Sequence, residues 1–245
     1  MQENWFKDWF NSPYYHILYK NRDENEAMQL IDKLISHLNL PKHSKIVDVA
    51  CGKGRHAIHL AEYEFDVTGI DLSEESIEEA LLSEKENLHF YTHDMRQPFW
   101  INYFDYAFNF FTSFGYFKTN KENENAIRTI SQTLVKGGSF IIDYINTDYA
   151  TSHIVHSEEK NIDGINFSII RWHDDHKFYK KIIIDDPSVS NSIVFVEEVQ
   201  KFTSADFETL FKMHGLHIKS IYGNYDFSKY DALESPRMII VAEKL

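Results

Sequence analysis

The sequence contains little cysteine, proline and glycine, and it has no long apolar run. Its 245 residues include one cysteine, Cys51, with nine glycines and five prolines. A single cysteine excludes a disulfide framework and a cysteine-rich metal site. Few glycines and prolines argue against long flexible linkers. The longest apolar run is residues 238–242, whereas a transmembrane helix needs about 20 such residues. We therefore expect no membrane partner.

Basic residues are also scarce relative to acidic ones. The chain has 25 Lys and Arg against 38 Asp and Glu, a net charge of −13. Because such a surface repels phosphate backbones, we expect no nucleic-acid partner. The first ten residues, MQENWFKDWF, lack the basic start and apolar block of a signal peptide. With the single cysteine, this favours a cytoplasmic location.

The first 40 residues have a helical pattern. Trp5, Phe6, Trp9 and Phe10 repeat at i, i+4 spacing, and Ser12-Pro13 interrupts that helix. A second apolar periodicity runs through 28–38 and stops before Pro41. We expect residues 1–40 to form an N-terminal helical lid.

Residues 45–144 alternate between strand and helix patterns. Expected strands lie at 45–50, 65–71, 87–94, 104–110 and 139–145, and expected helices at 55–63, after Ser73, and at 121–136 with Gly137-Gly138 as its end. This alternation predicts a parallel sheet covered on both faces. The pattern resumes with a helix from Thr203 to about Gly215 and two closing strands. We expect one α/β domain over 41–149 and 203–245.

Residues 150–202 differ from the rest of the chain. INFSIIRW, KFYKKIIID and SIVFVEEVQKF are three strand-like runs, separated at 173–176 and 185–192. They predict a small inserted antiparallel β-sheet, which either caps a substrate or forms a homodimer contact. The HDDH run at 173–176 contains metal-ligand residue types, but consecutive side chains on a turn diverge, so we expect no metal site.

The most informative segment runs from Asp48 to Ala57, with sequence DVACGKGRHA. It follows a strand and opens a helix, and Gly52 and Gly54 can adopt the positive φ that lets a ligand lie against the backbone. Asp71, 19 residues after Gly52 at the end of the next expected strand, can accept hydrogen bonds from ribose hydroxyls. The pair predicts an adenosine-containing ligand.

Two ligand classes fit this loop. Gly52-x-Gly54-x-x-Ala57 matches the dinucleotide fingerprint, which leaves an NAD(P)-dependent oxidoreductase open. Asp48, however, places a carboxylate at the crevice, which suits a positively charged ligand better than a pyrophosphate.

Four segments together resemble the class I S-adenosylmethionine (SAM)-dependent methyltransferases, in their small-molecule branch. They are the loop from Asp48, the Gly69–Ser73 segment, His93-Asp94-Met95 with Pro98-Phe99, and 109–117. The ending at 222–228 and 235–242 is similar to the last hairpin of that branch. The resemblance implies a Rossmann-like, doubly wound, mostly parallel seven-stranded sheet with an antiparallel C-terminal hairpin.

The resemblance also implies a cofactor site for SAM, with S-adenosylhomocysteine as product. Asp48 would lie near the cofactor's ammonium group, and Asp71 would bind its ribose. Asp94 would accept from the adenine amino group, with Met95 beside the ring. The lid would reach the cofactor's carboxylate through Arg22. The implied cofactor-binding residues are Asp48, Ala50, Gly52, Gly54, Asp71, Leu72, Asp94, Met95, Phe110, Tyr14 and Arg22.

The expected reaction is methyl transfer to N or O of a small-molecule acceptor by in-line displacement. Asn109 is followed by Phe110-Phe-Thr, without the prolines typical of methyltransferases that act on DNA adenine or on release-factor glutamine. No general base can be assigned, although Tyr116 and the insertion's Tyr and His residues are candidates. We expect His56 on a helix surface. A non-catalytic SAM-binding protein of the same fold is the other alternative.

Overall fold

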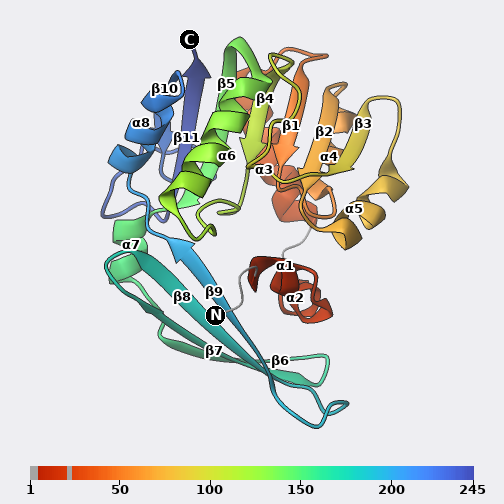
Figure 1. The fold of residues 1–245 in the computed structure, drawn as a ribbon, viewed down its shortest axis with the longest axis vertical. Coiled ribbons are helices and arrows are strands. Elements are labelled where there is room, and N and C mark those ends of the chain that lie inside the picture. The colour runs from red at the N-terminus through yellow and green to blue at the C-terminus, as the bar shows by residue number, and fades with distance from the viewer. Residues whose placement is uncertain (1–4, 21–23) are drawn as a thin grey trace.

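A seven-stranded sheet forms the larger part of the structure, a computed structural model that describes residues 5–20 and 24–245 (Figure 1). The strand order is β10-β11-β5-β4-β1-β2-β3. Strand β11 runs antiparallel to both neighbours, and the other pairs are parallel. The predicted α/β fold class is confirmed. The strands are β1 (Lys45–Val49), β2 (Asp66–Asp71), β3 (Leu88–Thr92), β4 (Phe104–Asn109), β5 (Leu134–Ile145), β10 (Leu216–Tyr222) and β11 (Arg237–Lys244).

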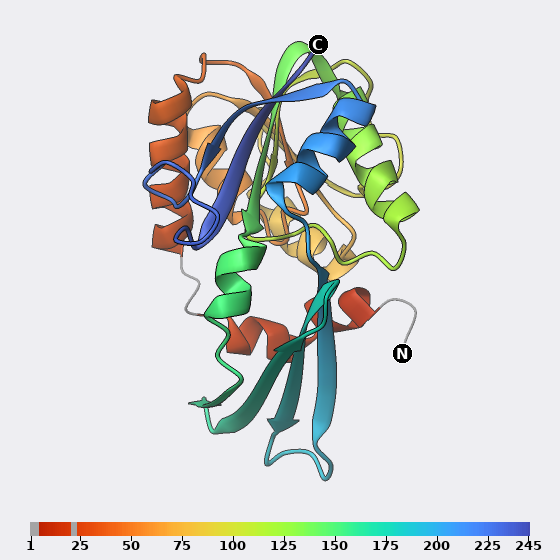
Figure 2. The same ribbon diagram turned by 90° about the vertical axis from the view of Figure 1, so that its left-hand side faces the viewer.

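Helices cover both faces of this sheet, which explains why its central strands are apolar almost throughout. Helices α3 (Glu24–Leu38), α4 (Arg55–Glu62) and α5 (Glu74–Ala80) pack on one face. Helices α6 (Asn120–Thr133) and α8 (Ser204–Met213) pack on the other (Figure 2). Among the described residues, no helix is long and apolar enough to cross a membrane.

One predicted boundary is wrong. Helix α6 ends at Thr133, and β5 begins at once at Leu134, so the glycines at 137 and 138 lie inside a strand rather than after a helix. The pairing of β4 with β5 shifts register between Phe104 and Tyr106. Gly137 has φ 79°, and a Cβ on Gly138 would lie 3.0 Å from the Asp105 carbonyl. The glycines therefore allow a bulge against β4.

A separate four-stranded antiparallel sheet follows α7 (Thr147–Ser152). Three of its strands were predicted, whereas β6 was missed because SEEKNI contains a single apolar residue. An edge strand can be that polar, since it has one neighbour. The strands are β6 (Ser157–Ile162), β7 (Ile165–His173), β8 (Lys177–Asp185) and β9 (Ile193–Gln200).

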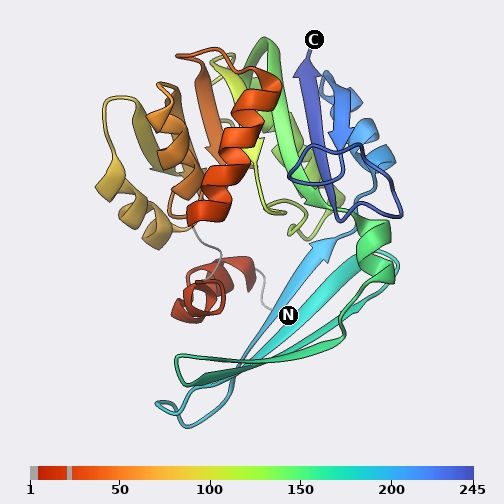
Figure 3. The same cartoon turned by 180° about the vertical axis from the view of Figure 1, so that it is seen from behind.

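Two short helices, α1 (Trp5–Phe10) and α2 (Pro13–Leu18), lie between the two sheets (Figures 1 and 3). The predicted break at Ser12-Pro13 is confirmed, because the Ser12 side chain caps α2 and Pro13 is its first residue. Trp9 is fully buried against the four-stranded sheet, and its ring lies 4.7 Å from that of Phe195. The inner face of that sheet and these helices thus share one apolar core (Trp9, Leu18, Phe167, Ile169, Ile182, Ile184).

We predict that Trp9→Ala loosens the helices from the four-stranded sheet. The change removes a buried indole and its 2.7 Å hydrogen bond to Glu197, a loss of roughly 3 kcal/mol. Amide hydrogen exchange of 13–18 should accelerate strongly. Trp172→Ala is the matched control, because Trp172 lies 39% exposed on the same sheet. Equal effects of the two variants would contradict the shared core.

Candidate functional site

A cavity of about 1540 Å³ lies where the carboxyl ends of the parallel strands face α1, α2 and the four-stranded sheet. Ligands of doubly wound sheets bind at this edge. Most of the sequence-predicted site residues line the cavity: Asp48, Ala50, Gly52, Asp71, Leu72, Asp94, Met95 and Phe110. Tyr116 and the buried His56 line it as well.

The loop after β1 has three residues at positive φ: Ala50 at 60°, Gly52 at 56° and Gly54 at 81°. A Cβ on Gly52 would meet nothing within 4 Å, whereas one on Gly54 would lie 2.6 Å from the Phe90 ring. Gly54 is therefore required where α4 begins beside β3, and it does not line the cavity. Ala50 adopts the left-handed region without being glycine, at a cost of about 1 kcal/mol.

Asp71 ties the ends of β1 and β2 together. Its Oδ2 accepts from the Gly52 N–H at 2.8 Å, and its Oδ1 accepts from the Ser73 N–H at 2.8 Å. Burial raises the pKa of Asp71, while these backbone hydrogen bonds counteract the rise. Each carboxylate oxygen can accept one further hydrogen bond, so Asp71 can still hold ligand hydroxyls.

Asp48 is a buried carboxyl group with an unsatisfied atom. It is 1% exposed, and its Oδ2 has no hydrogen-bond partner. Burial, reinforced by the negative charge of Asp71 and opposed by Arg55, raises the pKa of Asp48 to about 8. Such a group is costly to leave unpaired. The site therefore suits a ligand that brings a cationic donor.

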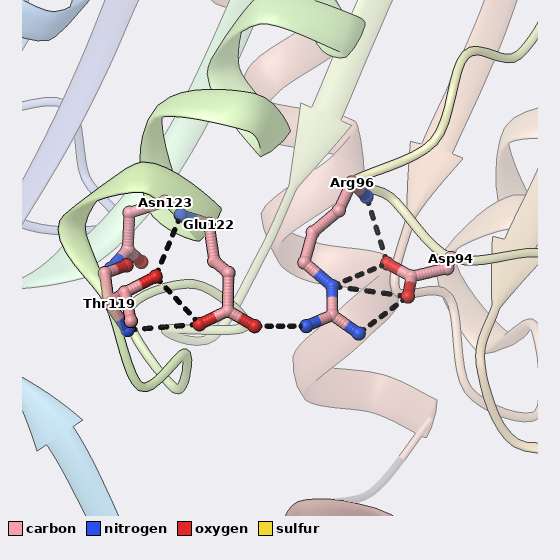
Figure 4. Close-up of polar contacts among 5 residues, drawn as sticks. All are labelled: Asp94, Arg96, Thr119, Glu122 and Asn123. Carbon is pink, nitrogen blue, oxygen red and sulfur yellow. Dashed lines mark hydrogen bonds and ion pairs between the residues drawn. The ribbon is translucent and has the colours of Figure 1, made fainter.

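Asp94 takes part in a network that the sequence did not predict (Figure 4). The Arg96 guanidinium donates to both Asp94 oxygens at 2.6 to 3.1 Å, and its other end pairs with Glu122 at 2.6 Å. Glu122 also accepts from Thr119, which caps α6. Burial alone would raise the pKa of Asp94, but the hydrogen bonds and charge of Arg96 hold it below its usual value. In the sequence, the presence of an arginine two residues after Asp94 was the feature from which this pairing could have been predicted.

The predicted surface position of His56 is wrong. We expected a helix-surface residue, but its side chain is 5% exposed, with its ring stacked on Phe111 at a centroid distance of 5.3 Å. The first turn of α4 faces the segment after β4, which covers the imidazole. Burial, with a smaller effect of Arg55, lowers the pKa of His56 to about 3, so the ring is neutral.

The segment after β4 is held in a strained conformation. Phe111 and Thr112 have φ values of 55° and 62°. The buried Asp143 carboxylate accepts from the Phe111 N–H at 2.8 Å, and Arg237 bridges Asp143 to the Thr112 hydroxyl. Backbone strain of this kind persists where surrounding contacts enforce it, and it is frequent at ligand sites.

The structure does not support the cofactor-binding role that we predicted for Tyr14, and it does not describe Arg22. The Tyr14 hydroxyl donates to Asp186 at 2.9 Å and does not line the cavity, which does not support a cofactor contact. Its neighbour Tyr15 lines the cavity instead, as does Tyr19. Arg22 lies outside the described residues. In the HDDH run, Asp174 accepts from the backbone of His176 and Lys177, so it caps a turn.

We predict that Gly52→Ala and Gly54→Ala lower the stability of the protein to different extents. Gly54→Ala should lower the free energy of unfolding by about 3 kcal/mol, because it combines backbone strain with a clash on Phe90. Gly52→Ala introduces strain alone and should cost about 1 kcal/mol. Urea denaturation measures both values. Equal losses would show that the loop geometry described above is wrong.

Comparison with known proteins identifies the family of the chain. A sequence family described as a methyltransferase domain matches residues 40–184. YqeM of Bacillus subtilis, named as a candidate methyltransferase, is 33% identical over 129 residues, which cover 46% of this chain and 51% of that relative. The match thus spans about half the length of that relative.

Two further proteins are similar over most of the chain. The dTDP-3-amino-3,4,6-trideoxy-alpha-D-glucopyranose N,N-dimethyltransferase of Streptomyces venezuelae is 22% identical over 85% of this chain and 91% of its own. The crystal structure of an S-adenosylmethionine-dependent methyltransferase from Clostridium acetobutylicum has a TM-score of 0.77 at 19% identity, over 94% of this chain and 96% of that one. This second likeness concerns the fold. The family match covers more than half of the chain, and its range includes the loop from Asp48 and the segment 109–117. The chain therefore belongs to the methyltransferase domain family of SAM-dependent methyltransferases.

Proposed function

We propose that this protein is a cytoplasmic enzyme that transfers a methyl group from SAM to a nitrogen or oxygen atom of a small molecule. The observation that carries the proposal is the buried, unpartnered Asp48 carboxyl group, which lies in the same cavity as Gly52 and Asp71. A cofactor with an ammonium group and a ribose complements both carboxyl groups. The Streptomyces relative, an N,N-dimethyltransferase of an amino sugar nucleotide by name, supports a small acceptor.

The proposed cofactor contacts follow from the geometry. Asp48 accepts from the ammonium group, and Asp71 accepts from the ribose hydroxyls with the lone pairs that Gly52 and Ser73 leave open. The bare backbone of Gly52 allows close approach of the methionyl part. We propose that Leu72, Met95 and Phe110, which line the cavity, contact the adenosine part of the cofactor. Asp94 accepts from the adenine amino group.

Arg96 is the positioning residue for Asp94 in this scheme. Its bidentate contact fixes the carboxylate plane, while the pairing with Glu122 anchors the guanidinium to the start of α6. The same contact occupies part of the acceptor capacity of Asp94. The adenine amino group therefore has to share the carboxylate with Arg96.

The cavity has room for an acceptor beside the cofactor. Its volume of about 1540 Å³ exceeds the roughly 300–1,000 Å³ typical of a single small-molecule site. The sulfonium of bound SAM supplies an electrophilic methyl group. The protein's part is to hold the acceptor atom in line and to exclude water. We propose that α1, α2 and the four-stranded sheet provide that enclosure, with the catalytic residue unassigned.

We predict that S-adenosylhomocysteine binding at pH 7 releases about one proton. Asp48, with a pKa of about 8, is mostly protonated in the empty protein at pH 7, and pairing with the ammonium group lowers that pKa. Calorimetry in two buffers of different ionisation enthalpy measures the release. The Asp48→Asn variant should bind more weakly and release no proton. A binding heat independent of the buffer in the wild type would rule out this role.

The same pKa shift predicts a pH dependence of stability. The folded pKa of Asp48 lies above its unfolded value of about 3.8, so folding disfavours the ionised form. This group's contribution to stability therefore declines as the pH rises from about 4 to about 8. Asp48→Asn should lack that decline, which makes it relatively more stable at pH 8.

Turnover is tested by a screen for transfer of labelled methyl from SAM to amines, amino sugars and phenols. We expect activity with at least one class, and Asp71→Ala should weaken cofactor binding by roughly 1.5–3 kcal/mol through lost ribose hydrogen bonds. Asp71→Asn is the matched control and should lose less. Tight S-adenosylhomocysteine binding without transfer to any class would indicate a non-catalytic SAM-binding protein.

A further inference from the structure

A row of charged side chains crosses the inner face of the four-stranded sheet. Arg171 on β7 is the cross-strand partner of Lys180 on β8, and Lys180 is the partner of Glu197 on β9. Glu158 on β6 pairs with Arg171 at 2.7 Å. All four residues line the cavity.

The row is charged although the same face is otherwise apolar. Because side chains alternate along a strand, Arg171 shares its face with Phe167 and Ile169, and Lys180 shares its face with Ile182 and Ile184. Those four apolar residues are buried in the core with α1 and α2. The inner face thus changes from apolar to charged where the packing on the helices gives way to the cavity.

These charges are partly withdrawn from water. The exposed side-chain fractions are 15% for Lys180, 17% for Glu197 and 28% for Arg171. Like charges directly opposite each other destabilise a sheet, and partly buried charges are costly to desolvate. Glu158 pairs with Arg171, and both Glu197 and the Tyr19 hydroxyl contact the Lys180 ammonium group, which offsets part of this cost. A further anion at Arg171 and Lys180 would offset more of it.

The cavity as a whole has the opposite charge balance to the chain. Among the described residues that line it, seven are basic and five are acidic, in a chain with a net charge of −13. The carboxyl groups of Asp48, Asp71 and Asp94 lie at the end of the large sheet. Lys160, Arg171 and Lys180 lie on the four-stranded sheet. The large sheet also contributes Lys53, Arg55 and Arg237 to the lining, so its side is balanced in charge. The opposite wall contains the adjacent cations Arg171 and Lys180 beside Glu158 and Glu197.

We infer that Arg171 and Lys180 bind an anionic group of the methyl acceptor, either a phosphoryl or a carboxyl group. This inference rests on the proposed methyl transfer, because it assigns the acceptor to the wall opposite the cofactor. A guanidinium offers paired donors that match either anion, and the adjacent ammonium adds a second charge. The acceptor is thus an anionic small molecule, and the row sets its orientation.

The test is calorimetric titration of the protein saturated with S-adenosylhomocysteine, using inorganic pyrophosphate in one arm and succinate in the other. We expect at least one anion to bind, and the stronger arm identifies the group. Lys180→Gln and Arg171→Gln should each weaken its binding at least about tenfold. Lys181→Gln is the matched control, because it makes the same charge change on the opposite face of β8 and should alter binding less than about twofold.

A variant that is expected to strengthen anion binding separates a role in anion recognition from a structural role. Glu197→Gln removes a competing negative charge while keeping an oxygen for the Trp9 N–H, which donates at 2.7 Å. We expect it to bind the anion about threefold more tightly. No anion binding to the saturated protein, or equal losses in Lys180→Gln and Lys181→Gln, would overturn the inference. If the wild-type protein does not bind S-adenosylhomocysteine, the proposed function is refuted instead.

Discussion

The unpaired carboxyl group of Asp48 is the constraint around which the site is arranged. It stands near the end of β1, between β2 and β4, where it is 1% exposed at the edge of the cavity. The adjacent Asp71 already accepts from two backbone N–H groups, whereas Asp48 has an oxygen with no partner. In the empty protein this oxygen is a cost to stability. A bound cation turns the same atom into a source of affinity.

The second constraint is the mutual burial of α1, α2 and the four-stranded sheet. Helices of six residues are not stable alone, and the apolar face of the four-stranded sheet is buried by packing on them. Their shared core around Trp9 and Ile182 places them together below the carboxyl edge of the large sheet (Figure 3). The space that this arrangement leaves is large enough for two ligands. One wall belongs to the methyltransferase sheet, and the other belongs to the segment between α7 and α8.

The sequence predicted features that depend on local chemistry. The strands around the loop from Asp48 to Gly54 were recognisable because parallel strands buried on both faces are short apolar runs. The positive φ of Gly52 and Gly54 was predictable because a residue without a Cβ adopts it at little cost. The β6 strand was missed, since an exposed edge strand has no apolar pattern to detect.

Features that depend on tertiary contacts were not predictable from local patterns. The burial of His56 results from the segment after β4, more than 50 residues away in the chain. The ion pairs of Arg96 with Asp94 and Glu122 form because the start of α6 lies beside the loop after β3. In the charged row across β7, β8 and β9, each strand taken alone shows only the usual alternation of polar and apolar residues. Its meaning depends on the strand register.

The central claim is that SAM binds against β1 and β2 with its ammonium group at Asp48. The most direct measurement is a crystal structure of the complex with S-adenosylhomocysteine. We expect the amino group of the ligand within hydrogen-bond distance of the Asp48 carboxylate and its ribose hydroxyls on Asp71. A ligand bound elsewhere in the cavity, with the Asp48 oxygen still unpartnered, would contradict the account.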